Sequence, residues 1–243
     1  METVLIMTRK RIYAILLGLV LATAVCTTGQ AIVIENSLMV TDVTPVNFSV
    51  VWATSEPATG WVNVFLDADG SIPYTEAKVE FESAKHAPAE ELGVMKVRVG
   101  GLKPDTCYYF QTVSDSKKDN ISFVFPNATP FSPDHMVKTE KASRMVRNDV
   151  LVHKVSDGID TSTGMLIVAR VAGASYPVTG WVGYGVPERW APINANNFYD
   201  IQDHVNLELL GGEEISLMLF GGLLGFEATQ TTIPEETGGM QQF

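Results

Sequence analysis

Four histidines supply the side chains that most often bind zinc or transfer protons in this 243-residue chain. They lie in four separate segments, and none has a second histidine four residues away, the spacing that places two imidazoles on one face of a helix. These residues are His86, His135, His153 and His204. The chain also contains no G-x-S-x-G nucleophile motif, no P-loop and no G-x-G-x-x-G. We therefore predict a protein that is not an enzyme and that needs no metal and no cofactor.

Two oxygen-rich segments have the composition of calcium loops. In "DADGSIPYTE" the acidic residues Asp67, Asp69 and Glu76 follow the spacing of such a loop, but the first ligand position falls on Phe65, which has no side-chain oxygen. We interpret this segment as a turn, because Asp and Gly are ordinary turn residues. The second segment is interpreted as a capped loop or a single helical turn, with calcium binding as the alternative. Its oxygen donors are Asn194, Asn196, Asn197, Asp200 and Asp203.

Aromatic side chains offer a third kind of chemistry, because their flat faces stack on sugars and peptides. If the segment around Trp181 and Tyr184 is one regular strand, these two residues point to opposite faces, so at most one of them faces the core. The favoured interpretation is that these rings fill β-sandwich cores, as aromatics usually do, and a binding platform is the alternative. The predicted binding residues are Trp181, Tyr184, Trp190, Phe198 and Tyr199, and Trp61 is a further aromatic of the same kind.

The elements that must position these residues are strands. Apolar and polar residues alternate with period two in five runs of the first half, and no run of twelve residues keeps a helical period. These runs cover residues 38–44, 48–54, 60–66, 94–102 and 107–113. Alternation indicates strands with one buried face, as in antiparallel sandwiches. We predict an all-β protein.

The first half resembles a fibronectin type III domain over residues 33–142. Trp52 stands where that family keeps a core tryptophan, and "LKPDTCYYF" matches its corner through Leu102, Pro104 and Tyr108. The resemblance implies structural roles for these four residues, with the tyrosine hydroxyl bonded to nearby backbone. The insert 67–93 departs from the family's short connection. Cys107 must face away from Tyr108, and we expect the insert or the second half to cover it.

The second half, residues 148–233, resumes the strand pattern with many glycines, which suit hairpins and bulges. We predict a second antiparallel sandwich, in tandem with the first. Its segment 161–180 resembles transthyretin-like and carboxypeptidase-regulatory-like modules. Residues 234–243 are predicted to form a flexible tail.

Residues 1–31 have the pattern of a secretory signal peptide. Three cations, Arg9, Lys10 and Arg11, precede an apolar run over residues 12–25 that is shorter than a membrane span. We predict cleavage after Ala31, with an uncleaved anchor as the alternative. Lipidation at Cys26 is disfavoured, because the bulky Val25 precedes it. The predicted location is periplasmic, cell-surface or extracellular.

Charge narrows the range of partners. The chain carries a formal net charge of −11, and removal of residues 1–31 takes away three cations and one anion, which leaves about −13. Such a surface repels phosphate backbones, so we expect no nucleic-acid partner. No membrane span is expected after the signal. We therefore predict an exported, non-catalytic binding or assembly module whose partner is a protein, a surface polymer or a second copy of the chain. The alternative is an accessory domain of a hydrolase system that binds polysaccharide or another polymer.

Overall fold

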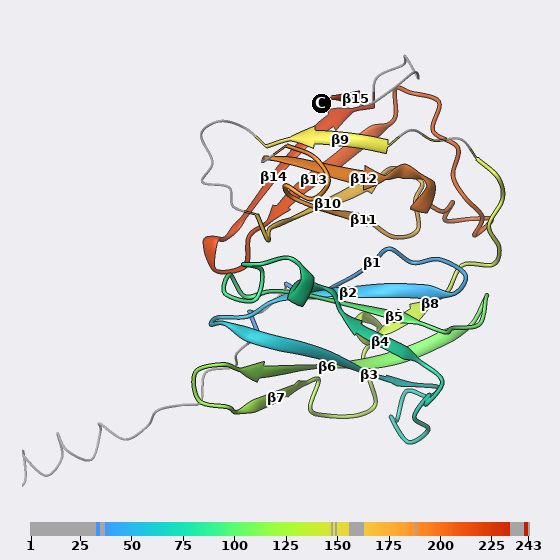
Figure 1. The fold of residues 1–243 in the computed structure, drawn as a ribbon. Helices are drawn as coiled ribbons and strands as arrows, with labels where there is room; N and C mark the ends of the chain where they lie inside the picture. Colours follow the sequence, from blue (N-terminus) through green and yellow to red (C-terminus); the bar gives the residue numbers. More distant parts are fainter. Residues whose placement is uncertain are drawn as a thin grey trace, which may run out of the picture. The chain divides into compact units, whose positions relative to one another are not determined.

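The computed structural model describes residues 33–34, 37–146, 148, 150–155, 163–187, 189–233 and 241–242. Strands and short 3-10 helices are the regular elements of these ranges, and no α-helix occurs in them (Figure 1). The predicted all-β class is confirmed. The predicted signal segment, residues 1–31, and residues 234–240 and 243 of the predicted tail lie outside the described residues.

The first half consists of two antiparallel sheets. One has the order β1-β2-β5-β4, and in the other β3 and β6 are neighbours while β7 and β8 both pair with β6. The strands are β1 (Met39–Thr41), β2 (Asn47–Ala53), β3 (Ala58–Phe65), β4 (Lys78–Phe81), β5 (Val94–Gly100), β6 (Cys107–Ser116), β7 (Ser122–Phe125) and β8 (Met136–Lys138). Two 3-10 helices, η2 (Glu82–Lys85) and η3 (Pro133–His135), lie in the connections.

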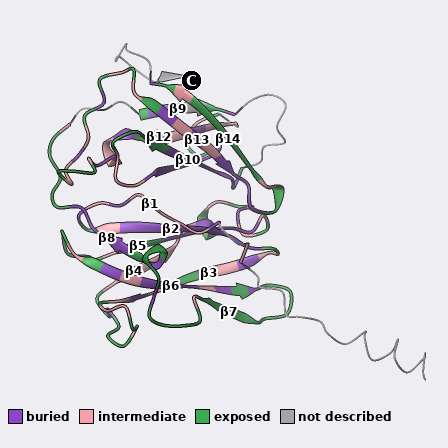
Figure 2. Ribbon diagram, turned by 180° about the vertical axis from the view of Figure 1, so that it is seen from behind, coloured by how far each residue is buried: buried purple, intermediate pink, exposed green. Residues whose placement is uncertain are grey.

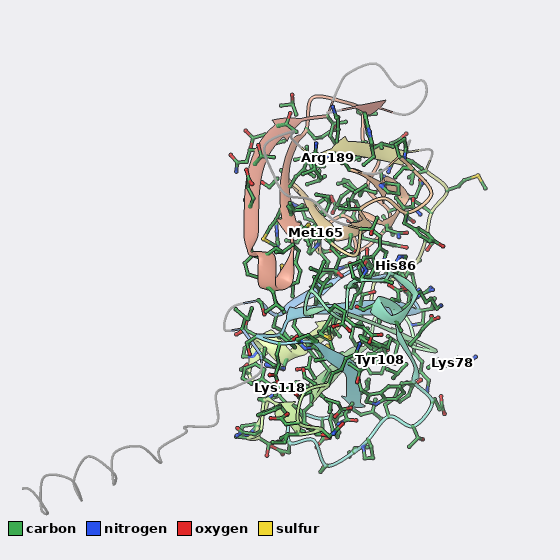
Figure 3. The ribbon with its side chains drawn as sticks, turned by 60° about the vertical axis from the view of Figure 1, so that its left-hand side comes forward. Lys78, His86, Tyr108, Lys118, Met165 and Arg189 are labelled. Atoms are coloured by element: carbon green, nitrogen blue, oxygen red, sulfur yellow. The ribbon has the colours of Figure 1, made fainter. Side chains whose placement is uncertain are left out.

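Trp52 and Tyr108 lie in the core between these two sheets and are fully buried. The indole Nε1 of Trp52 donates to Ser114 Oγ at 2.9 Å, which ties β2 to β6 across the core. The backbone N–H of Lys103 donates to the Tyr108 hydroxyl at 2.9 Å, so the hydrogen bond expected of the corner is present. Figure 3 labels Tyr108 among the side chains of the first half. Leu102 belongs to the same core, whereas Pro104 is exposed on the corner.

The second half also consists of two sheets. They have the orders β11-β10-β13-β14 and β12-β9-β15, and they enclose a cluster of buried residues that includes Ile167, Ile193 and Leu217. All pairings are antiparallel except that of β15 with β9, so Gln241 and Gln242 of the predicted flexible tail form a short parallel strand. The elements are β9 (Val150–Lys154), β10 (Leu166–Val171), β11 (Val178–Trp181), β12 (Trp190–Asn194), β13 (Glu214–Phe220), β14 (Phe226–Thr232), β15 (Gln241–Gln242), η4 (Ala195–Asn197) and η5 (Gly222–Leu224).

A third hydrophobic cluster joins the halves. Val51 and Ala53, on the face of β2 opposite Trp52, pack in one cluster with Leu166 and Phe220 of the second half. This explains why β2 is buried on both faces (Figure 2), whereas an ordinary sandwich strand alternates. Residues 32–243 form one compact unit. The boundaries 33–142 and 148–233 remain a prediction about how the chain divides.

Polar residues link the same two parts of the chain. Lys96 of β5 is buried, and its Nζ lies 3.1 Å from Asp42 Oδ2 and 2.9 Å from Glu82 Oε2. Asp42 also accepts hydrogen bonds from the backbone N–H and the hydroxyl of Thr179 in β11, at 2.8 and 2.5 Å. A buried charge is tolerated only when it is paired and hydrogen-bonded. Lys96 meets that condition through Asp42 and Glu82, and Asp42 in turn links it to Thr179 of the second half.

The expectation that Cys107 would be covered is wrong. It faces away from the core, as predicted from Tyr108, but its side chain is exposed. The reason is that the second half covers the outer face of the β1-β2-β5-β4 sheet, whereas Cys107 lies on the outer face of the other sheet. Among the described ranges, no helix has the length and hydropathy needed to cross a membrane.

Candidate binding surface

Phe198 and Tyr199, two of the predicted binding residues, are buried. Asn194 caps η4 by accepting a hydrogen bond from the Asn196 N–H, and the chain then turns so that Phe198 enters the core of the second half. The Tyr199 hydroxyl lies 2.9 Å from Ser143 Oγ. Neither ring is available to stack on a ligand in this structure.

Trp181 and Tyr184 lie together with His86. The imidazole stacks on the Trp181 ring at a centroid distance of 4.1 Å, and Tyr184 meets the imidazole edge-on at 4.6 Å. Trp181 is buried and Tyr184 is 62% exposed. The strand β11 ends at Trp181 and a turn follows, so the two residues are not on one regular strand as assumed. Burial lowers the pKa of His86, and the nearby Glu82 carboxylate opposes that effect.

Trp190, the last of the five predicted binding residues, is half-buried at the start of β12. Its register partner is Lys154 of β9, and it is not among the residues that stack around His86. The five aromatics therefore do not form one exposed platform. Only Tyr184 presents most of its side chain to solvent.

A different aromatic lies at one end of an apolar row on the outer face of the β3-β6-β7 sheet. Trp61 of β3 is opposite Val113 of β6, and Val113 is opposite Val124 of β7, so the three side chains share the outer face of three adjacent strands. Trp61 is 46% exposed and Val124 is 42% exposed, and Figure 2 shows β7 largely in the colour of exposed residues. We call Trp61, Val113 and Val124 the Trp61 surface.

Polar groups border the Trp61 surface on one side. The next register row contains Thr59, Asp115 and Ser122, and the Ser122 hydroxyl donates to Asp115 Oδ1 at 2.5 Å. The charged group is therefore held at the border, and the row itself is apolar. An apolar centre with a polar rim is the usual arrangement of a protein-binding patch.

The other end of this sheet face is closed. Phe131, from the segment between β7 and η3, packs against Phe65 at 5.4 Å and against Tyr109 at 6.5 Å between ring centroids. Its backbone N–H donates to the carbonyl of Ala68 at 2.8 Å, which joins this segment to the loop after β3. Phe131 is buried as a result. The open part of the face is the end at Trp61.

The oxygen-rich segments are used in turns. Asp67 accepts hydrogen bonds from the Ser71 hydroxyl and from the backbone N–H of Ile72, at 2.6 and 2.8 Å. These bonds, led by that of Ser71, lower the pKa of Asp67. Asp200 accepts from the N–H groups of Gln202 and Asp203. Within the described part of the chain, no group of three His, Cys, Asp or Glu side chains has the arrangement of a metal site.

One buried carboxylate lies beside a histidine and a serine. Glu140 is fully buried, its Oε2 is 2.9 Å from His204 Nδ1, and its Oε1 accepts from the Ser175 hydroxyl. In a catalytic triad the serine bonds to the imidazole. Here both Ser175 and His204 bond to the carboxylate. This arrangement gives the buried Glu140 side chain its hydrogen-bond partners, but it lacks the contact between nucleophile and base that acyl transfer requires.

Comparison with known proteins gives no family for this chain: no protein-family model matches it, and no curated protein does.

Proposed function

We propose that this protein is an exported, non-catalytic binding module that docks a protein partner on the Trp61 surface. The observation that carries the proposal is the row of Trp61, Val113 and Val124 across three strands, in which Trp61 and Val124 are exposed and Val113 is half-buried. Tryptophan is enriched among residues that dominate binding energy. The outer face of the other sheet already packs on the second half, so of the two outer sheet faces in the described first half, this is the one left for a partner.

The resemblance of residues 33–142 to fibronectin type III domains is part of the proposal. The sheet orders β1-β2-β5-β4 and β3-β6-β7 correspond to the two-sheet arrangement of immunoglobulin-like sandwiches, and the Lys103–Tyr108 hydrogen bond supports the corner. Such sandwiches serve many unrelated functions, so the binding role rests on the Trp61 surface. Export rests on the signal pattern of residues 1–31.

A second candidate is binding of a polysaccharide or another polymer. It is favoured by the position of the Trp61 ring next to the polar residues Asn63 and Gln111, which follow on the same sheet face. A sugar ring could stack on the indole while these amides bind its hydroxyl groups. The aliphatic side chains of Val113 and Val124 favour a protein partner over a sugar, because they offer no hydrogen bonds.

The test compares immobilised wild-type protein with a Trp61→Asp variant and with an Arg170→Asp control. Arg170 is exposed on β10 in the second half, so its replacement leaves the Trp61 surface unchanged. Proteins from the envelope and culture medium of the source organism, and a panel of polysaccharide gels, are offered to each. We expect a discrete protein that the wild type and the control retain and the Trp61 variant loses. Retention of a polysaccharide with the same pattern would instead favour the second candidate. Equal retention by all three proteins would contradict both.

A further inference from the structure

Among the residues that the structure describes, the strand β14 is an open edge of its sheet. It pairs with β13 on one side, and the sheet order ends with it on the other. Six of its seven residues are exposed, and Figure 2 shows the strand in that colour. Unpaired edge strands are templates for pairing with another strand.

The hydrogen-bond register shows which backbone groups face the open side. Gly221 N–H donates to the Gly225 carbonyl and Ile233 N–H donates to the Glu213 carbonyl, both in register with the β13–β14 pairing. Because hydrogen-bonded pairs alternate in an antiparallel ladder, the odd-numbered residues of β14 bond to β13. The N–H and C=O groups of the even-numbered residues therefore point outward. These are Phe226, Ala228, Gln230 and Thr232.

We propose that two copies of this chain pair through β14, antiparallel and about a twofold axis at Thr229. In that register Ala228 of each copy faces Gln230 of the other, and Phe226 faces Thr232. All outward groups of both strands are then paired, which gives about eight hydrogen bonds between the copies. The two four-stranded sheets become one continuous sheet.

A second copy can pair with β14 because few charged side chains would meet there. The chain has a net charge of −11, so contact between copies is favourable only where few charges meet. Glu227 is the single charged residue of β14, and the proposed register places it opposite the neutral Thr231. The two Glu227 carboxylates are then four residues apart along the strands, roughly 13 Å, which exceeds the screening length of about 8 Å at physiological salt.

Other edges of the described sheets are short, charged, next to a proline or already partly paired. The eight-residue edge strand β3 is of the last kind, because on its outer side Ala58 N–H donates to the Glu90 carbonyl and the Val64 carbonyl accepts from Tyr74 N–H. The edge strand β4 has Lys78 and Glu80 among its four residues, and β1 has only three residues. The edge strand β7 has four residues and is followed by Pro126, which has no N–H. Charged side chains, short length and proline all disfavour edge pairing. β14 has seven residues, no lysine and no proline.

The test is sedimentation velocity of the full chain, in the form that cells produce, from low micromolar to several hundred micromolar protein. We expect a monomer–dimer equilibrium for the wild type. Ala228→Pro removes an outward N–H and leaves the β13 ladder intact, so this variant should remain monomeric with an unchanged melting temperature. The matched control Ala228→Ser keeps the N–H and should dimerise as the wild type does.

A second variant covers the case in which the proline disturbs the strand. Gln230→Lys keeps every backbone group but places two ammonium groups at diagonal positions of one face, about 7–8 Å apart. It should weaken the dimer at least tenfold at low salt and less at high salt. A wild type that stays monomeric over the whole range, or an Ala228→Pro variant that dimerises normally, would overturn the proposal. Trp61→Asp should leave the dimer unchanged, so failure here is distinguishable from failure of the proposed function.

Discussion

Replacement of Lys96 with methionine should destabilise the protein by about 3 kcal/mol, because it removes the cation between two largely buried carboxylates. The Lys96 Nζ is within 3.1 Å of Asp42 and within 2.9 Å of Glu82. Loss of one partner of a buried pair costs roughly 3–5 kcal/mol. The lower value applies because the side chains of Asp42 and Glu82 keep 13% and 19% of their exposure and because Thr179 still donates to Asp42.

The destabilisation should depend on pH in a defined direction. Burial disfavours the charge on Lys96, but Asp42 and Glu82 outweigh it and hold the pKa of the ammonium group above its ordinary value of 10.5. A group whose folded-state pKa is raised contributes stability below its unfolded pKa and loses it as the pH rises through the folded pKa. The difference between wild type and Lys96→Met should therefore be full at neutral pH and shrink above pH 10.5.

Urea unfolding followed by circular dichroism measures this difference. Lys103→Met is the matched control, because Lys103 is exposed and its backbone N–H, which bonds to Tyr108, is retained. The control should change the free energy of unfolding by less than about 0.5 kcal/mol. A Lys96→Met variant as stable as the control, or a difference that does not shrink at alkaline pH, would refute the reasoning.

Three further perturbations test single features. Gly60→Ala should lower the free energy of unfolding by about 1–3 kcal/mol, because the added Cβ would lie 2.8 Å from Trp52 Cζ2. An unchanged denaturant midpoint would show that the core adapts. Burial lowers the pKa of His135 and outweighs a backbone hydrogen bond at Phe110, which raises it. Protonation of His135 is therefore easier in the unfolded chain, and the free energy of unfolding should fall as the pH drops below 6.5. An NMR titration midpoint of His135 at or above 6.5 would contradict that burial. Cys107 should react with a thiol reagent in the native state as fast as in denaturant, and slow native labelling would show that something covers it.

Several local features of the fold could be predicted because they depend on neighbouring residues in the sequence. The alternation in "CYYFQTV" correctly assigned Tyr108 and Phe110 to the core side of β6 and Cys107 to the other side. The run "FSVVWAT" predicted a strand over 48–54, and β2 covers Asn47–Ala53. For β6 the period of two decides which face is buried, and it needs no knowledge of distant parts of the chain. For β2 only the strand itself was predicted, because the second half covers its outer face and both faces are buried.

The features that depend on distant contacts could not be predicted. Whether an outward side chain is exposed depends on which sheet face the second half covers, and this is why the burial of Cys107 was predicted wrongly. The same contact hides Trp181 and leaves Trp61 exposed, although the sequence placed both among its candidate aromatics. The buried position of Lys96 also has no local signal, because Asp42 and Glu82 come from separate segments.

Site-specific photo-crosslinking tests the central claim, that the Trp61 surface binds a protein partner, most directly. A benzophenone side chain is placed at Val124, beside Trp61, or at the control position Arg170, and the protein is irradiated in cells of the organism that makes it. We expect one discrete protein adduct from position 124, its loss when Trp61→Asp is added, and none of that species from position 170. The absence of a discrete adduct at position 124, or an adduct that persists with Trp61→Asp, would show that the Trp61 surface does not bind a protein partner.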